Sequence, residues 1–196
     1  EISSSLTSFG LDCFRECSSL TKISIPPSVT SIKDNTFYEC SSLEEIVIPS
    51  SVTSIGRNAF HKCISLKKLS DLSSVSEIKA CAFYKCSSLE EVIINSTSLN
   101  AITNCAFYNC SSLKKIILPS SLKLIEEFAF SGCSLLEQIE IPFSVTLIEN
   151  YAFNKCSSLT HIEIPSSMTE IKNHCFKECT SLKRILIPSS ITCIRI

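Results

Sequence analysis

The chain has 196 residues, which suits one ordinary domain, and its formal net charge is −1 at pH 7. A near-neutral chain carries no broad positive field, so the charge gives no support to a nucleic-acid or anionic-membrane partner. There is no run of about 18 apolar residues, so no bilayer-spanning helix is expected. The thirteen cysteines are odd in number, unlike the even set typical of a small disulfide-stabilised secreted domain.

The cysteines recur at a fixed period. A Phe-x-x-Cys tetrad begins at Phe14, Phe37, Phe60, Phe83, Phe107, Phe130, Phe153 and Phe176. Successive phenylalanines are 23 residues apart, except for one step of 24 residues between Phe83 and Phe107. A registered period of this length is the signature of a solenoid. Residues 1–196 are therefore expected to form a single repeat domain of about eight 23-residue repeats, truncated at both ends.

One repeat, residues 32–55, shows the expected elements in chain order. The stretch from Ile32 to Cys40 is too short for a stable helix and predicts a helical or 3-10 turn. Residues 46–48 and 52–55 alternate apolar and polar side chains with a period of two, which predicts strands. One repeat has a single apolar side, so copies must stack, with strands pairing in parallel about 4.8 Å apart. The turn wall is bulkier than the strand wall, which favours a curved stack with a concave sheet.

The consensus Leu-x-x-Ile-x-Ile-Pro-x-Ser-Val-Thr-x-Ile-x-x-x-Ala-Phe-x-x-Cys, clear at residues 48–53 and 59–63, resembles the BspA-like class of leucine-rich repeat over essentially the whole chain. The resemblance implies an α/β horseshoe or solenoid: a right-handed leucine-rich repeat of short parallel strands with helical or 3-10 turns on the convex side. Similar proteins occur in anaerobic bacteria and parasitic protists, and many are surface proteins implicated in adhesion. A fold does not by itself fix a function.

The resemblance therefore favours a non-enzymatic protein–protein interaction module, at the cell surface or secreted, that binds a host or partner protein through the concave sheet. The alternative is an intracellular scaffold or regulatory leucine-rich repeat protein. Thirteen largely unpaired thiols suit a reducing cytoplasm or an anaerobic habitat better than an oxidising exterior. The identity of the partner stays open.

Two copies depart from the consensus. In one, Asp71-Leu72 replaces Ile-Pro, and in the next, residues 95–99 carry an extra residue and no proline. A bulge or irregular turn is therefore expected near residues 70–74 and 95–100. These loops are interpreted either as neutral variation at a tolerant turn or as a distinct binding loop.

The in-register cysteines are expected to form a buried ladder of small apolar residues, because adjacent rungs that point the same way are poorly placed for disulfides. Cys81 and Cys105 share a different position in neighbouring coils, and a disulfide or redox contact between them is left open. The three histidines occupy unrelated repeat positions, and no glycine-rich phosphate loop or four-ligand zinc set is present. The sequence predicts no enzyme, cofactor, metal or small-molecule substrate.

The two residues after each repeat leucine alternate in charge along the chain, as in Glu44-Glu45, Lys67-Lys68 and Glu90-Glu91. In a parallel stack each acidic pair then lies between basic pairs, and each opposite-charge contact contributes about 0.2–1 kcal/mol. This ladder is interpreted first as self-complementarity of the stack and second as a ligand surface.

One outward-facing position per strand lies between the two inward apolar residues. The row that it forms is Ser24, Val47, Ser70, Ile93, Ile117, Glu140, Glu163 and Leu186. Ile93 and Ile117 are neighbours, and an exposed apolar pair flanked by charge is a candidate protein-binding patch, with Glu140 and Glu163 as its acidic end. Alternatively, these are scattered exposed apolar residues without a partner. No polar cap is visible at either end, which indicates either that the full protein contains more chain or that the ends are covered by edge or end-to-end self-association.

Overall fold

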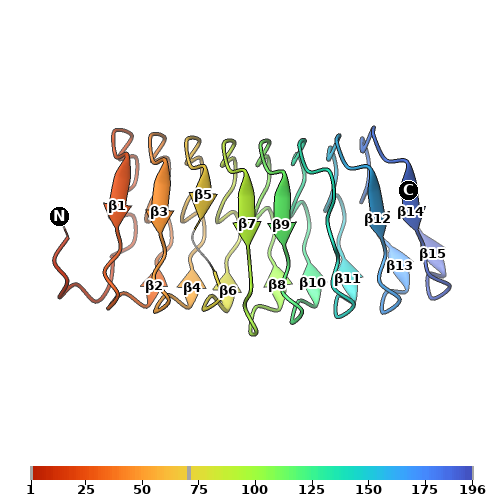
Figure 1. The fold of residues 1–196 in the computed structure, drawn as a ribbon, viewed down its shortest axis with the longest axis horizontal. Coiled ribbons are helices and arrows are strands. Elements are labelled where there is room, and N and C mark those ends of the chain that lie inside the picture. Colours follow the sequence, from red (N-terminus) through yellow and green to blue (C-terminus); the bar gives the residue numbers. More distant parts are fainter. Residues whose placement is uncertain (1, 70–71, 196) are drawn as a thin grey trace.

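A computed structural model describes residues 2–69 and 72–195 of the chain. The chain winds into coils that lie side by side in one row, with the two termini at opposite ends (Figure 1). We name each coil by the phenylalanine of its Phe-x-x-Cys tetrad. Within a coil the chain passes through a segment of turns, a front strand, a tight turn and a back strand. The predicted parallel solenoid is confirmed.

The front strands face the viewer in Figure 1. They are β1 (Lys22–Ser24), β3 (Glu45–Val47), β5 (Lys68–Leu69), β7 (Glu91–Ile93) and β9 (Lys115–Ile117), which form one parallel sheet, and β12 (His161–Glu163) and β14 (Arg184–Leu186), which form a second. In β3 the buried Ile46 lies between the exposed Glu45 and Val47, so side chains alternate between the core and solvent as the sequence predicts.

The back strands are two residues long and pair in parallel as three separate sheets. They are β2 (Ser31–Ile32), β4 (Ser54–Ile55) and β6 (Glu77–Ile78); β8 (Ala101–Ile102), β10 (Leu124–Ile125) and β11 (Leu147–Ile148); and β13 (Glu170–Ile171) and β15 (Cys193–Ile194). The isoleucine of each strand except the terminal β15 points into the core.

The described residues contain no helix, so the predicted helical or 3-10 turns are wrong, and no described segment is a helix that could cross a membrane. Each turn segment instead holds two residues in the left-handed region, such as Asn35 and Glu39, both at φ 55°. A positive φ interrupts the succession of right-handed residues that a helix requires. Backbone amides therefore turn sideways: the Phe37 N–H donates to the Ala59 carbonyl of the next coil at 2.8 Å. These lateral bonds satisfy groups that a helix would satisfy internally.

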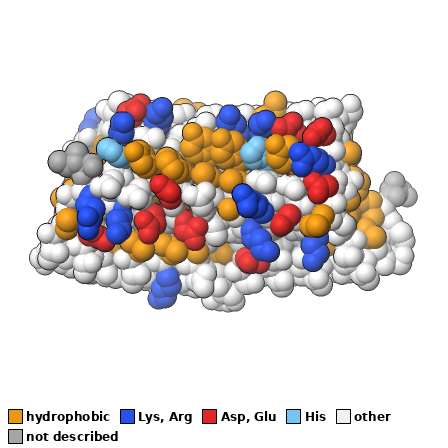
Figure 2. Space-filling view, turned by 180° about the vertical axis from the view of Figure 1, so that it is seen from behind, with side chains coloured by type: hydrophobic (Ala, Val, Ile, Leu, Met, Phe, Trp, Pro, Cys, Tyr) orange, Lys and Arg blue, Asp and Glu red, His pale blue; other side chains and the backbone are white. Residues whose placement is uncertain are grey.

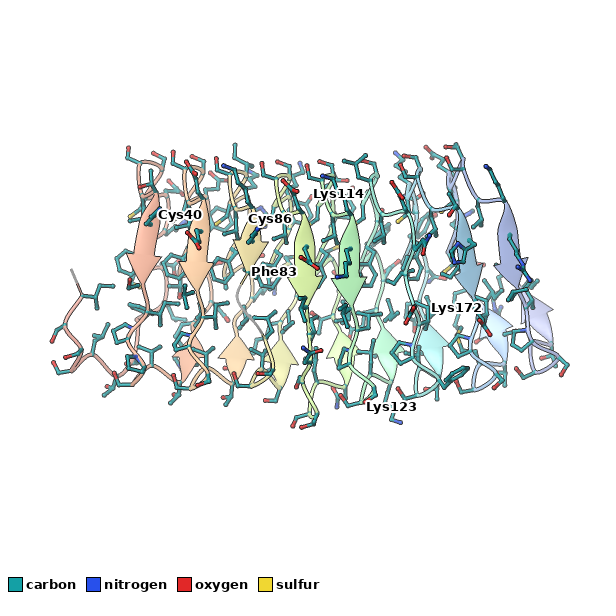
Figure 3. The ribbon with its side chains drawn as sticks, viewed as in Figure 1. Cys40, Phe83, Cys86, Lys114, Lys123 and Lys172 are labelled. Atoms are coloured by element: carbon teal, nitrogen blue, oxygen red, sulfur yellow. The ribbon has the colours of Figure 1, made fainter. Side chains whose placement is uncertain are left out.

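The core lies between the two faces and consists of ladders of identical residues. Ring centroids of successive core phenylalanines are 5.3 Å apart for Phe37 and Phe60 and 5.2 Å apart for Phe83 and Phe107. The predicted cysteine ladder is also confirmed: Cys40, Cys63, Cys86, Cys110, Cys133 and Cys156 are buried, free thiols (Figure 3). The Cys63 Sγ donates to the Phe37 carbonyl at 3.1 Å, so the ladder also satisfies backbone acceptors.

The irregular turn expected near residues 95–100 is present. Residues 97–98 form an open bend where other coils have a hydrogen-bonded two-residue turn. The buried Ser96 Oγ accepts hydrogen bonds from the Ser98 and Leu99 N–H groups, both at 3.1 Å, and so replaces the missing proline turn. In the other irregular copy, residues 70 and 71 lie outside the described residues.

Candidate protein-binding face

The predicted outward row lies along the front face. The strand register places Ser24 opposite Val47, Ile93 opposite Ile117 and Glu163 opposite Leu186. The exposed fractions are 60% for Val47, 38% for Ile117 and 41% for Leu186, whereas Ile93 is half-buried. Glu140 is exposed but lies in a coil without a front strand. Ser70, which would continue the row, lies outside the described residues. The structure thus brings Ile93 and Ile117 together and leaves Val47 apart from them.

The charges on the N-terminal part of this face are bound to one another. The front register places Lys22 opposite Glu45, and Glu91 opposite both Lys68 and Lys115. Ion pairs join Lys67 to Glu44 at 3.3 Å, Lys114 to Glu90 at 3.4 Å and Lys115 to Glu91 at 2.8 Å. All these side chains are well exposed, so each pair contributes less than about 1 kcal/mol. Their main consequence is that few charges on this part of the face are left for a partner.

Beyond β9 three acidic side chains of the front face form no such ion pair. Glu137, Glu140 and Glu163 are exposed, and no ion pair joins any of them to a lysine or arginine of the described chain. The C-terminal part of the front face therefore carries uncompensated negative charge over the Phe130 and Phe153 coils.

The front hydrogen-bond ladder breaks at the same place. In earlier coils the Lys67 N–H donates to the Glu44 carbonyl at 3.1 Å, and the Lys114 N–H donates to the Glu90 carbonyl at 2.9 Å. Within the described residues, no equivalent bond joins the Glu137 N–H to the Lys114 carbonyl. Residues 137–141 form no strand, and only an isolated bridge links Gln138 to His161. The sheet is therefore open between β9 and the Phe130 coil.

A groove of about 880 Å³ lies at this break. Its apolar lining includes Ile117, Ile141 and Phe143. Its polar lining includes Glu137, Glu140 and Glu163, together with His161 and with Lys114 and Lys115, which pair with Glu90 and Glu91. Three residues of the predicted row thus line one concavity. The combination of apolar surface and a few polar groups is typical of a binding site.

Phe143 is the residue that the sequence analysis missed. Its side chain is 76% exposed, and it occupies the turn position that is Ser50, Ser120 and Ser166 in other coils. Phe143 lies on a turn, outside the outward strand positions that the repeat pattern singles out. A phenylalanine in a slot held by serine in most other coils, and by Pro27 and Thr97 in two, was the available signal, because a largely exposed aromatic on a turn contributes little to the stack.

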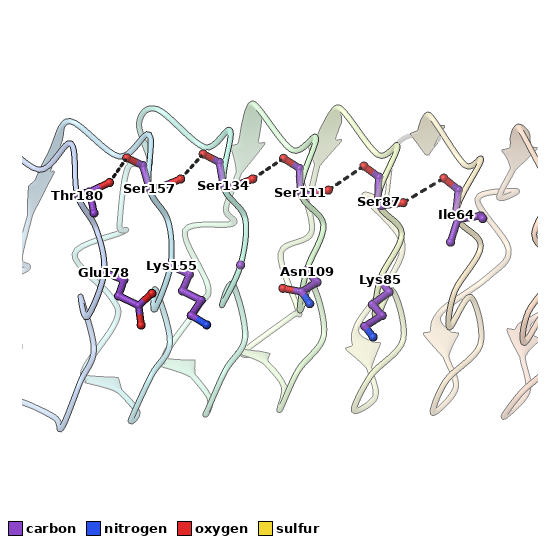
Figure 4. A pocket seen from close by; sticks show the side chains of 11 residues that line it. Ile64, Lys85, Ser87, Asn109, Ser111, Ser134, Lys155, Ser157, Glu178 and Thr180 are labelled. Carbon is purple, nitrogen blue, oxygen red and sulfur yellow. Dashed lines mark hydrogen bonds between the residues drawn. The ribbon is translucent and has the colours of Figure 1, made fainter.

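A second hollow, of about 660 Å³, runs along the edge of the stack (Figure 4). Its hydroxyls form a ladder: Ser111 donates to the Ser87 carbonyl at 3.4 Å, and Ser134 donates to the Ser111 carbonyl at 3.2 Å. Serine is therefore engaged in joining coils here, which gives the residue a structural role.

A row of aromatic side chains crosses the back face, where Figure 2 shows apolar side chains with two histidines among them. Tyr38, His61, Tyr84 and Tyr108 stack with centroids 4.6–4.8 Å apart. Burial lowers the pKa of His61 to about 4. Because each ring covers the face of the next, the row presents only ring edges to solvent and serves mainly to join the coils.

The histidines do not assemble a reactive centre in the described chain. His61 belongs to the back row, His174 contacts Tyr151 in a second aromatic stack, and His161 lies in β12 on the front face. No described group of three or more histidine, cysteine, aspartate or glutamate side chains is placed to hold a metal ion.

Comparisons with known proteins agree on the fold. Residues 1–111 and 76–196 match the model of the BspA type leucine rich repeat region (6 copies). A leucine-rich repeat protein from Bacteroides ovatus is 34% identical, with a TM-score of 0.90, and the match covers 96% of this chain and 49% of that one. One from Eubacterium ventriosum is 34% identical, with a TM-score of 0.73 and coverages of 79% and 41%. The T. pallidum leucine-rich repeat protein is 26% identical, with a TM-score of 0.61 and coverages of 89% and 73%. The chain therefore spans about half the length of the first two relatives. No curated protein matches the chain.

Proposed function

Because the chain belongs to the BspA-type leucine-rich repeat family, we propose that it is a non-enzymatic module that binds a partner protein through the groove at the break in its front sheet. The family supports a role in protein interaction or at a surface. The observation that carries the proposal is the coincidence of a missing hydrogen-bond rung, exposed apolar side chains and unpaired acids in one concavity.

The groove defines the chemistry of the partner. Ile117 and Phe143 supply an exposed apolar surface into which one partner side chain can insert, and such central anchors carry most of the energy of an interface. The unpaired Glu137, Glu140 and Glu163 attract lysine or arginine side chains around that anchor. The missing hydrogen bond between the Glu137 N–H and the Lys114 carbonyl leaves backbone groups with which an extended segment of a partner can pair. The expected ligand is an extended, basic segment with an apolar residue near its centre.

The test uses synthetic peptides of about 12 residues with one central leucine, flanked either by lysines or by glutamates. Fluorescence anisotropy of the labelled peptides should show saturable binding of the lysine-flanked peptide only, weakened by salt because exposed charges are screened. Phe143→Ser, which restores the residue used by other coils, should weaken binding about 10-fold or more, equivalent to about 1.4 kcal/mol.

Val47→Ser is the matched control, since Val47 is an exposed apolar residue of the same face outside the groove. It should leave the affinity unchanged. Ile117→Asp should abolish binding while circular dichroism and melting temperature stay near those of the parent. Equal binding of both peptides, or equal losses in Phe143→Ser and Val47→Ser, would exclude the groove as the binding site.

We propose adhesion at the cell surface or as a secreted protein as the setting for this binding, on the strength of the family. An intracellular scaffold is the second candidate, and the free state of all thirteen cysteines favours it. Labelling of intact cells with a membrane-impermeant amine reagent separates the two, because only an exterior protein is modified before lysis.

A further inference from the structure

The cysteines fall into two classes by environment. The ladder thiols, such as Cys86 and Cys110, are completely buried, and each donates to the carbonyl of the core phenylalanine in the preceding coil. Cys81 and Cys105 are half-exposed and begin the turn segments of neighbouring coils. These two residues are therefore accessible to reagents, whereas the ladder is not.

The backbone brings Cys81 and Cys105 side by side. Both have left-handed conformations, with φ of 59° and 54°. The Cys81 N–H donates to the carbonyl of Asn104, the residue directly before Cys105, at 2.9 Å. Each of the two thiols is the largest influence on the pKa of the other, whereas the ladder sulfurs each donate to a phenylalanine carbonyl. Neighbouring parallel coils lie about 4.8 Å apart, within the range of Cα separations that a disulfide spans.

The pair lies immediately after a gap in the back ladder. In regular coils an amide makes the rung, as where the Lys79 N–H donates to the Ile55 carbonyl at 2.9 Å and the Glu126 N–H donates to the Ile102 carbonyl at 2.8 Å. Between β6 and β8 the Thr103 hydroxyl donates to the Ile78 carbonyl instead, at 2.8 Å, and the two strands belong to different sheets. This is the step that contains the 24-residue repeat. A covalent link here would add a second connection beside the Cys81–Asn104 backbone bond, next to the position where the back strands lack an amide bond.

We propose that Cys81 and Cys105 form a dithiol site that reacts with small disulfides, of the oxidised-glutathione class, to give a reversible disulfide between the Phe83 and Phe107 coils. Cys81 is the attacking group. Its thiolate attacks one sulfur of the small disulfide, which forms a mixed disulfide and expels one thiolate. Cys105 then loses its proton and attacks the Cys81 sulfur, which closes the protein disulfide and expels the second thiolate. Two protein thiols are oxidised, and one small disulfide is reduced to two thiols that take up the two protons.

The surroundings of the pair determine which thiol attacks. The neighbouring Cys105 thiol lowers the pKa of Cys81 to about 7, and the positive charge of Arg57 acts in the same direction against burial. The Cys81 thiol in turn raises the pKa of Cys105. Burial raises the pKa of Cys86 and Cys110. Cys81, beside the positive charge of Arg57, therefore loses its proton more readily than Cys105, whose pKa the negative charge of Glu127 raises, and the thiolate is the nucleophilic form.

The experiment treats the folded, fully reduced chain with oxidised glutathione at pH 7 and maps disulfides by peptide mass spectrometry. A Cys81–Cys105 link should form before any modification of the exposed Cys13 or Cys193, which serve as internal controls. Cys105→Ser keeps a hydrogen-bond donor but removes the second sulfur, so glutathione should accumulate on Cys81. Cys105→Ala removes the donor as well, so the initial reaction of Cys81 at pH 7 should slow several-fold relative to Cys105→Ser.

A second measurement protects the test against misfolding of these variants. In denaturant, the unmodified chain should lose its preference for Cys81, and all thirteen thiols should react at similar rates. Failure of the folded chain to form the Cys81–Cys105 link, or reaction of Cys81 no faster than Cys193, would overturn the proposal. Neither result depends on whether the front groove binds a peptide.

Discussion

The core phenylalanine ladder provides a quantitative test of the fold. Phe107 is fully buried, and its ring stacks on Phe83 at 5.2 Å and on Phe130 at 5.7 Å, with interplanar angles of 6° and 5°. Phe107→Ala removes both contacts and leaves a cavity between close-packed coils, for which the expected loss is about 3–5 kcal/mol in the free energy of unfolding. In a chain of this size 1 kcal/mol shifts the melting temperature by roughly 2–4 °C, so a fall of about 6–20 °C is expected.

Two matched substitutions make this measurement decisive. Phe176→Ala truncates a half-buried ring near the end of the ladder, which stacks on Phe153 at 5.7 Å, so it should cost distinctly less. Lys115→Ala removes an ion pair whose lysine side chain is 60% exposed, so it should cost less than about 1 kcal/mol. Thermal and urea unfolding followed by circular dichroism give the order. Equal melting shifts for Phe107→Ala and Lys115→Ala would show that the assignment of the inside and outside of the coil is reversed.

Three further substitutions test local features by the same unfolding assays. Gly132→Ala should destabilise the fold, because φ is +79° and the new Cβ would lie 1.9 Å from the Asn109 Oδ1; Asn109→Gly in the same chain should recover part of the loss. The pKa of His61 is about 4 in the folded chain and near 6.5 in the unfolded chain, so the unfolded state binds more protons between these two pH values, and the free energy of unfolding should fall as the pH is lowered from 6.5 to 4. His61→Phe should reduce this dependence of stability on pH, and an unchanged dependence would contradict the assignment. Ser96→Ala leaves two amides without their acceptor and should cost about 1–3 kcal/mol, whereas the exposed Thr97→Ala should be nearly neutral.

The parts of the fold that follow from one repeat could be predicted from the sequence. The alternation at 46–48 identifies the front strand, and the 23-residue period fixes which residues of adjacent strands face each other, as in the pairing of Ile46 with its neighbours in β1 and β5. The alternating Glu and Lys pairs add a register constraint that the ion pairs across β7 and β9 satisfy. Both properties are local patterns that recur in most copies, so one regular copy specifies how regular coils stack.

The turn segments could not be predicted in this way. Asparagine at 35 and 58 tolerates a positive φ, but Phe128 and Tyr151 occupy the same left-handed position at φ 57°, where bulky residues are uncommon. Their conformation is imposed by lateral hydrogen bonds from neighbouring coils, such as the Tyr151 N–H to the Asn173 carbonyl at 3.1 Å. Those bonds exist only once the coils have stacked, so no reading of the short Phe-x-x-Cys segment by itself distinguishes a helical turn from this arrangement.

The break in the front sheet is likewise invisible in a single repeat. Glu137-Gln138-Ile139-Glu140-Ile141-Pro142 carries the same apolar pattern as the coil before it, yet its rung with Lys114 is absent from the described ladder. Each coil of a solenoid contacts only its neighbours, so small offsets between unequal coils accumulate along the stack. A pattern shared by all copies carries no information about where such an offset opens a rung.

Regular coils of this stack offer little to a partner. Their backbone groups are paired with the next coil, their serine hydroxyls donate to neighbouring carbonyls, and their front charges form ion pairs with one another. Binding there would have to break existing contacts to make equivalent ones, with little net gain. Where a rung is missing that cost is absent. The front groove beside β9 and the dithiol that follows β6 and β8 both adjoin such gaps. Chemistry and recognition are therefore expected at the irregular steps of this chain and not at its repeated residues.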